Sequence, residues 1–216
     1  MKKIFLLFSL FSVCSYAQIR EENNVELSPF IGYLRSDYFG GKTTKSTESI
    51  GNIQIGVNLD VYLNNRISLK TGLEFVTLGS SANGQKFIIT EEGEGKYIDS
   101  KFKDHLYFIG VPFHVNIHIG KKRNWNLDLG PTLSYMLTAK KETGLLFEDV
   151  NKLQLGWSFA AGYRIPVSET FAIIFEYQQY YGFINNNKKS RYPNYRSLKA
   201  VNNYYGAFNI KGVFNL

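Results

Sequence analysis

The chain has 216 residues, a formal net charge of +7, 44% hydrophobic residues and 16% aromatic residues. This length fits one domain, and so apolar a composition excludes an intrinsically disordered chain. The charge is only mildly basic, and we expect no nucleic acid partner because the chain begins with an export signal.

The first 17 residues have the pattern of a secretory signal peptide. Residues 1–3 are basic at two positions, residues 4–13 are apolar but too few to span a membrane as a helix, and residues 15–17 end in the small side chains that a signal peptidase needs. We predict that residues 18–216 form the mature domain. A lipoprotein acylated at Cys14 is the alternative, but a valine precedes this cysteine where a smaller residue is expected. Cleavage after residue 17 removes the only cysteine, so the mature domain has no disulfide.

Eight segments of the mature domain alternate large apolar side chains with small or polar ones, which is the period of a β-strand. The clearest are two runs, 107–119 and 125–137, joined by the turn Gly-Lys-Lys-Arg-Asn. Each run exceeds the roughly 9 to 11 residues that a tilted strand needs to cross a bilayer. In chain order the eight segments are 25–35, 53–63, 67–75, 107–119, 125–137, 153–163, 171–183 and 204–216.

The connections between these segments alternate between short and long. The short ones are 64–66, 120–124 and 164–170, and the long ones are 36–51, 79–105, 138–152 and 184–203. Outer-membrane barrels have short periplasmic turns and longer extracellular loops. The pattern therefore predicts an up-and-down antiparallel meander, and its even strand number places the N- and C-termini in the periplasm.

Alternation alone does not say which face of the sheet points outward, because soluble lipocalin-like barrels also alternate. The interior of an eight-stranded barrel is only just filled by side chains, and the large apolar residues of one face are too many for it. The apolar face must therefore point into lipid. We predict an all-β, eight-stranded antiparallel transmembrane β-barrel, monomeric, in the outer membrane. Glycines accompany the polar residues of its lumen at Gly32, Gly56, Gly72, Gly110, Gly130, Gly156 and Gly162.

Aromatic residues near the segment ends fit this orientation, since barrels carry aromatic girdles at both membrane interfaces. The alternative is the general enrichment of aromatic residues in strands. The predicted long-loop girdle contains Tyr33, Tyr107, Tyr135, Tyr181 and Tyr204, and the short-turn girdle contains Trp125, Tyr163, Phe171 and Phe214.

Four short segments carry a family resemblance: Ala17-Gln18, residues 106–113 (Leu-Tyr-Phe-Ile-Gly-Val-Pro-Phe), residues 130–135 (Gly-Pro-Thr-Leu-Ser-Tyr) and residues 214–216 (Phe-Asn-Leu). They resemble the PorT-like outer-membrane β-barrel family of Bacteroidetes over most of the mature chain. The resemblance implies insertion by the outer-membrane assembly machinery, which reads the last strand. Leu216 stands where such signals often have phenylalanine. The resemblance also implies, as one possibility, a part in a secretion or gliding apparatus.

Two histidines, His114 and His118, are predicted to face the lumen. If Ile119 pairs with Trp125 across the turn, Asp128 lies beside both imidazoles. Histidine with a carboxylate can activate a nucleophile or hold a cation. Barrels that edit lipid A combine histidine with serine and an acid, but no serine occurs in residues 113–118. We favour a hydrogen-bonded plug, and we predict no catalytic residue, no metal and no cofactor.

Further charged residues are predicted to line the lumen. The turn at 64–66 sets Asp60 opposite Lys70. Charges inside a narrow barrel are costly unless paired, so we expect a ladder of ion pairs that closes the interior. A selective pore is the alternative, although the interior is too narrow for one unless the plug moves. The residues are Asp60, Lys70, Glu74, Arg164, Glu176 and Lys211.

The last long connection is basic. Facing the outer leaflet, it is a candidate to bind lipopolysaccharide phosphates or an acidic partner, although a solvated loop is the reading we favour. Connection 79–105 mixes both signs of charge with glycine, and we expect it to move. The basic residues of the last connection are Lys188, Lys189, Arg191, Arg196 and Lys199.

These features predict a structural or interaction role exerted through extracellular loops. Three alternatives stay open: a component of a secretion or gliding apparatus, a lipid-modifying outer-membrane enzyme, and a small pore. The expected partners are outer-membrane lipid and lipopolysaccharide, the assembly machinery and, under the first alternative, secretion-apparatus proteins.

Overall fold

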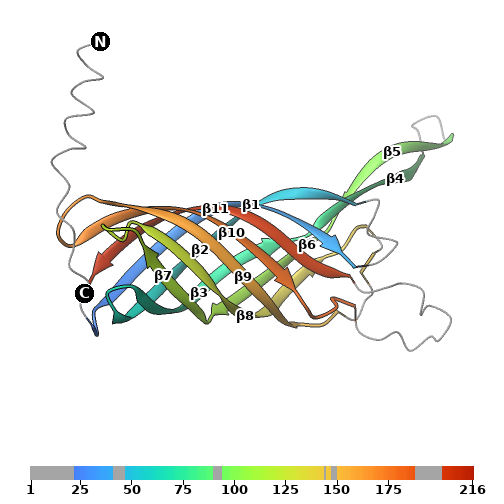
Figure 1. Cartoon of the computed structure of the whole chain (residues 1–216). Coiled ribbons are helices and arrows are strands. Elements are labelled where there is room, and N and C mark those ends of the chain that lie inside the picture. Colours follow the sequence, from blue (N-terminus) through green and yellow to red (C-terminus); the bar gives the residue numbers. More distant parts are fainter. Residues whose placement is uncertain (1–21, 41–46, 90–93, 144, 147–149, 188–200) are drawn as a thin grey trace, which may run out of the picture.

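The computed structural model describes residues 22–40, 47–89, 94–143, 145–146, 150–187 and 201–216. The predicted signal peptide lies outside these residues. Eleven strands form one antiparallel sheet that closes into a barrel (Figure 1). No helix in the described chain is long and apolar enough to cross a membrane. The strands are β1 (Val25–Phe39), β2 (Thr47–Asn64), β3 (Ile67–Leu78), β4 (Ser80–Ile89), β5 (Gly95–Lys103), β6 (His105–Pro112), β7 (His114–Ile119), β8 (Trp125–Lys140), β9 (Leu153–Pro166), β10 (Phe171–Gly182) and β11 (Asn202–Asn215).

The closed ring has eight strand positions, as predicted. Going round it, β1 is followed by β2, β3, the pair β6 and β7, β8, β9, β10 and β11, and β11 pairs with β1. β6 and β7 share one position, interrupted at Phe113. The interruption follows Pro112, which has no amide hydrogen for the ladder. The Phe113 amide donates to the Pro131 carbonyl at 2.9 Å, so the strand continues beyond this irregularity.

The two ends of the barrel differ. At the end that we call the turn end, short connections follow β2, β7 and β9, and the C-terminus lies there (Figure 1). At the opposite end, the hairpin end, the hairpin of β4 and β5 projects beyond the barrel (Figure 1). The alternation of short and long connections in the sequence thus corresponds to the two ends of the molecule.

Two of the predicted long loops are largely β-structure. β1 and β2 extend into residues 36–51, and residues 79–105 contain β4 and β5, which pair from Ser81↔Lys103 to Ile89↔Gly95. β2 extends far enough to pair with the base of β4. The prediction of a loop at 79–105 was wrong because neither face of this hairpin is buried in a core, so its sequence shows no clean alternation of apolar and polar residues.

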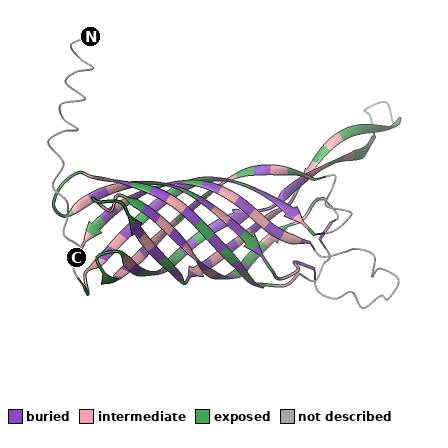
Figure 2. Ribbon diagram, viewed as in Figure 1, coloured by how far each residue is buried: buried purple, intermediate pink, exposed green. Residues whose placement is uncertain are grey.

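Burial alternates along the barrel strands (Figure 2), and the outward positions are apolar. Ile53 and Ile210, for example, are 59% and 52% exposed. A soluble protein does not expose so large a continuous apolar surface. At the turn end the aromatic rings pair across strands, with Trp125 and Tyr163 centred 5.0 Å apart, in the place expected for an interfacial girdle.

The interior has two parts. The half toward the turn end is polar and charged, whereas the half toward the hairpin end is filled by an apolar plug. The sequence analysis predicted small and polar residues along the whole lumen, so the structure differs from the prediction at this apolar plug. Inward positions of β3, β6 and β10 stay apolar near that end, and together they exclude water there. The plug contains Leu34, Tyr38, Val76, Leu78, Leu106, Phe108, Met136, Leu146, Tyr180, Val201, Tyr205 and Ala207.

Candidate functional site

An ion network occupies the centre of the lumen. The strand register places Asp60 opposite Lys70, but the Lys70 ammonium pairs with the carboxylate of Asp128 on β8. His114 joins this pair, because its Nδ1 lies 3.2 Å from Asp128 Oδ1. Asp60 instead accepts hydrogen bonds from Asn116 and Ser68, each at 3.1 Å. Neighbouring strands β2, β3, β7 and β8 are thereby tied together from the inside.

Two further ion pairs lie in the lumen. Lys211 Nζ lies 2.7 Å from Glu176 Oε2, and Arg164 Nη1 lies 2.7 Å from Glu26 Oε2. Glu26 was missed from the sequence, although it occupies an inward position of the first strand. Glu74 makes no ion pair within the described chain, and it lines the cavity that Lys211 also lines. The lumen residues thus lie together as a network rather than as a simple ladder.

His118 belongs to a second cluster, near the turn end. Its Nδ1 lies 2.8 Å from Asn126 Oδ1 and its Nε2 lies 3.2 Å from the Ser68 hydroxyl. The Tyr62 ring stacks on the imidazole at a centroid distance of 4.9 Å. The expectation that Asp128 lies beside both imidazoles holds only for His114. Asn126 and Ser68 occupy the two sides of His118, and sequence spacing missed Ser68 because it arrives from the neighbouring strand β3.

Serine, histidine and an amide oxygen in this order are the parts of a hydrolytic triad. Here Ser68 is 0% exposed, and the face of the His118 imidazole is covered by Tyr62. Within the described residues no group of three histidine, cysteine or acidic side chains is arranged to hold a metal. The geometry available to both histidines is that of hydrogen-bonded members of a packed interior.

Two small cavities lie in the lumen among the described residues. One, lined by Glu74, His114 and Lys211 among others, has a volume of about 10 Å³, and a second beside Tyr180 and Tyr205 is of similar size. Each has room for about one water molecule. The Tyr180 ring covers Gly156, where any side chain would collide with it, and stacks on Tyr205 at 5.1 Å. The described interior is therefore plugged.

Outside the barrel, the β4–β5 hairpin exposes apolar side chains toward its tip. Ile89 is 72% exposed and Tyr97 is 66% exposed, and the rings of Phe87 and Tyr97 lie 5.1 Å apart on one face. The hairpin is about ten residues long on each side, so at about 3.3 Å per residue its tip lies roughly 30 Å beyond the base. A cluster of exposed apolar residues away from lipid is typical of a protein contact site.

The outer edge of β5 is open. Among the described strands β5 pairs with β4 alone, and an exposed ion pair between Lys101 and Glu48 lies near the base of the hairpin. The hydrogen bond from Lys101 lowers the pKa of the Glu48 carboxyl from its usual value. Glu142 covers the lowest part of the edge by accepting from the Lys103 amide at 3.4 Å. From Gly95 to Lys101 no strand of the described chain lies beside this edge.

The basic residues predicted in the last long connection, Lys188, Lys189, Arg191, Arg196 and Lys199, lie outside the described residues. Their suggested binding of lipopolysaccharide phosphates or of an acidic partner therefore stays a prediction.

These features define an outer-membrane β-barrel. In agreement, residues 16–188 match the family model described as outer membrane protein beta-barrel domain, which covers more than half of the chain. The chain belongs to this family, and its place is the outer membrane. A comparison with curated protein sequences gives no match.

Among solved structures the chain is similar to several small barrels. One is Ail, the attachment invasion locus protein of Yersinia pestis, in complex with the heparin analogue sucrose octasulfate, at 10% identity and a TM-score of 0.43, covering 90% of this chain and 99% of that one. Neisserial surface protein A has 11% identity, a TM-score of 0.46 and coverages of 89% and 97%. The outer membrane protein OprG from Pseudomonas aeruginosa has 11% identity, a TM-score of 0.47 and coverages of 93% and 99%.

Proposed function

We propose that this protein is an outer-membrane docking protein that binds an extended segment of a partner protein along the open edge of β5. The observation that carries the proposal is the unpaired edge from Gly95 to Lys101, on a hairpin that stands clear of the barrel (Figure 1). An unpaired strand edge is a template on which another chain adds a strand.

The register tells which β5 amides point outward. The Asp104 amide donates to the Ser80 carbonyl at 2.8 Å, which makes this opposite pair a hydrogen-bonded one. Because hydrogen-bonded and non-bonded pairs alternate in an antiparallel ladder, the amides of Tyr97, Asp99 and Lys101 point away from β4. The Lys103 amide, two positions on, indeed points to Glu142. Three outward amides are thus available to a partner strand.

The side chains of β5 suggest the partner's chemistry. The strand carries three lysines and one aspartate, with the apolar residues Tyr97, Ile98 and Phe102 between them. Cross-strand neighbours of opposite charge stabilise a pairing, and apolar neighbours add contact area. A partner strand that alternates acidic and apolar residues fits this edge best.

A backbone test separates edge pairing from other contacts. Asp99→Pro removes one outward amide and leaves the bonds to β4 intact, because proline is tolerated on the free side of an edge strand. Asp99→Ala removes the same carboxylate but keeps the amide. In living cells, a photo-crosslinking residue at Tyr97 should yield one protein adduct of fixed mass with Asp99→Ala, and this adduct should be lost with Asp99→Pro.

Two outcomes would contradict the proposal. One is an adduct that persists unchanged with Asp99→Pro, and the other is the absence of any protein adduct at Tyr97 in the unsubstituted background. A photo-crosslinking residue at the lipid-facing position Leu69 serves as the control, since it should react with lipid only.

The proposal includes the orientation of the barrel in the outer membrane. We infer that the hairpin end is extracellular and both termini are periplasmic, as in barrels with short periplasmic turns. The assembly machinery that inserts such barrels is then a transient partner, and lipopolysaccharide surrounds the hairpin end. Protease added to intact cells should cleave within the β4–β5 hairpin and spare the barrel strands.

A part in a secretion or gliding apparatus is the second candidate, and it rests on the PorT-like resemblance of residues 106–113 and 130–135. In that case the strand bound to β5 belongs to an envelope secretion protein. A deletion strain should then show an altered set of secreted proteins, and an unchanged set would count against this candidate while leaving edge docking intact.

A further inference from the structure

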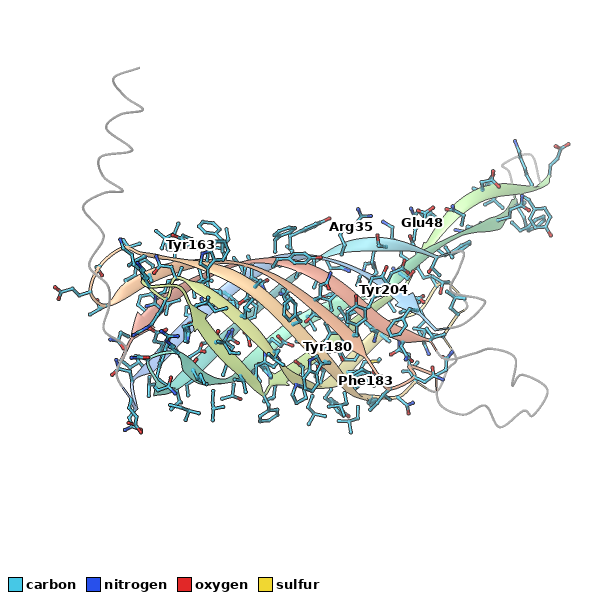
Figure 3. All side chains as sticks on the ribbon, viewed as in Figure 1. Arg35, Glu48, Tyr163, Tyr180, Phe183 and Tyr204 are labelled. Carbon is cyan, nitrogen blue, oxygen red and sulfur yellow. The ribbon has the colours of Figure 1, made fainter. Side chains whose placement is uncertain are left out.

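The outward face of the barrel carries a cation near the hairpin end. Arg35 projects outward from β1 next to lipid-facing residues (Figure 3), whereas Lys70, Arg164 and Lys211 form their ion pairs inside the lumen. It is the only lysine or arginine on the outward faces of β1, β2, β10 and β11 over their described lengths. A cation at this depth is costly unless it meets an anion.

Arg35 sits in a row that crosses four strands. The register places it between Gly51 of β2 and Gly206 of β11, and Gln179 of β10 follows Gly206. The row nearer the turn end contains Ile53, Tyr33, Phe208 and Tyr177, and the row nearer the hairpin end contains Asp37, Tyr204 and Tyr181. Arg35 therefore lies where the apolar band gives way to the aromatic girdle, at the level of lipid headgroups.

The two glycines let tyrosine hydroxyls enter this row. The Tyr33 hydroxyl lies where a Cβ on Gly51 would stand, and the Tyr177 hydroxyl lies 2.8 Å from the position of a Cβ on Gly206. Both hydroxyls thereby flank Arg35, one over each neighbouring strand. Residues directly opposite in an antiparallel pair have their Cα atoms about 5 Å apart, so the three polar groups are close enough to share one ligand.

The hydrogen bonds of the Tyr177 hydroxyl and of the Arg35 guanidinium leave donor groups available to a ligand. Gln179 Nε2 donates to the Tyr177 hydroxyl oxygen at 3.2 Å, so the Tyr177 proton is available to an acceptor outside. Arg35 Nη2 donates to the neutral Ser49 hydroxyl at 2.8 Å and forms no ion pair within the described chain. The carboxylate two positions along the same strand, Asp37, accepts at Oδ1 from the Ser80 hydroxyl at 2.6 Å and from the Tyr38 amide at 2.7 Å.

We propose that Arg35, Tyr33 and Tyr177 form a binding site for the phosphate of a membrane lipid in the leaflet at the hairpin end. The planar guanidinium suits a phosphate, since it can donate two parallel hydrogen bonds, and charge-assisted bonds of this kind are the strong ones. The acyl chains of the same lipid lie along the apolar row beneath, over Ile53 and Phe208. The site is separate from the β5 edge and does not depend on what docks there.

Two lipids that differ only in the phosphate test the site. The detergent-purified full barrel is titrated with dioleoyl phosphatidic acid or with dioleoylglycerol, and bound lipid is counted by native mass spectrometry. Unsubstituted protein should bind the phosphatidic acid about tenfold more tightly than Arg35→Gln does, which corresponds to about one strong hydrogen-bonded contact. Dioleoylglycerol should bind weakly and equally to both proteins.

Matched variants make the test specific. Lys140→Gln removes a cation at the same end that is paired with Glu142, and it should leave phosphatidic acid binding unchanged. Tyr177→Phe removes the hydroxyl and leaves Arg35 and its neighbouring glycines in place, and it should weaken binding. Each variant is compared only if it keeps the gel mobility shift of a folded barrel on boiling.

Equal binding of phosphatidic acid by the unsubstituted protein and Arg35→Gln would overturn the site, and so would equal binding of the two lipids. Inorganic phosphate at the same concentration should not displace the phosphatidic acid, because the acyl chains contribute to binding. Displacement by inorganic phosphate would show a free anion site and overturn the assignment to lipid.

Discussion

Lys70 and Asp128, 58 residues apart in the chain, form a buried ion pair that joins β3 to β8 across the inside of the barrel. Their side chains are 5% and 4% exposed. His114 of the intervening strand contacts the same carboxylate. A buried ion pair of this kind stabilises a protein little compared with apolar packing. Breaking it is costly, however, because the remaining charge stays buried without a partner.

Removal of one partner of this ion pair should therefore strongly destabilise the barrel. Lys70→Met leaves the buried Asp128 carboxylate without its ion-pair partner, and it should lower the free energy of unfolding by about 3–5 kcal/mol. The measurement is urea unfolding in detergent micelles, followed by tryptophan fluorescence. Adding Asp128→Asn to Lys70→Met should recover part of the loss, since it removes the uncompensated charge.

The exposed ion pair between Lys140 and Glu142 is the control for Lys70. Its side chains are largely in water, so Lys140→Ala should change the free energy of unfolding by less than about 1 kcal/mol. If Lys70→Met unfolds at the same urea concentration as Lys140→Ala, the lumen pair is not structural in the way described.

The seal at the hairpin end depends on the space above Gly156. A Cβ there would collide with the Tyr180 ring, whereas a Cβ on the outward-facing Gly212 meets its nearest atom at 3.4 Å. Gly156→Ala should therefore destabilise the barrel by about 1–3 kcal/mol through overpacking. Gly212→Ala should be close to neutral. Equal unfolding midpoints for the two variants in urea would refute the packing of Tyr180 on Gly156.

The hairpin should be dispensable for the barrel. Replacing residues 83–101 by Asn-Gly keeps the opposite pair Ala82 and Phe102 and closes it with a favoured two-residue turn. Because the ring of eight strands stays intact, the shortened protein should fold and keep its heat-modifiable gel mobility. A shortened chain that fails to fold would mean that β4 and β5 are part of the structural core.

The cluster of Ser68, His118 and Asn126 should have no catalytic activity. Ser68 is fully buried, so a fluorophosphonate probe should not label the folded protein, and His118→Ala should leave the lipid A mass spectrum of the cells unaltered. Labelling that is lost in Ser68→Ala would show instead that the barrel opens to expose an activated serine.

Sequence alternation predicted the barrel well because lipid imposes a strict rule on every second residue. Ile53 to Val61 on β2 shows this rule, since a slip of one residue would turn the whole apolar set inward. The same alternation correctly predicted that Asp60, Lys70 and Asp128 face the lumen.

The alternation of apolar and polar residues could not predict which charged side chains in the lumen pair with one another. Lys70 lies opposite Asp60 in register but bonds Asp128, because the side chains of four strands converge in a narrow interior. It also could not reveal the apolar plug, where Leu106 and Phe108 point inward while Tyr107 and Ile109 point outward. The continuous apolar run 106–109 was the available signal for a strand buried on both faces. The hairpin was missed because water lies on both of its faces.

The most direct test of the account concerns the outward apolar face. The two tryptophans, Trp125 and Trp157, are both exposed on it. In vesicles of lipid with brominated acyl chains, the fluorescence of Trp125→Phe and of Trp157→Phe, each carrying one remaining tryptophan, should be strongly quenched relative to vesicles of unbrominated lipid. Unquenched fluorescence from a folded barrel would mean that the apolar face does not meet lipid, and the membrane-spanning account would be wrong.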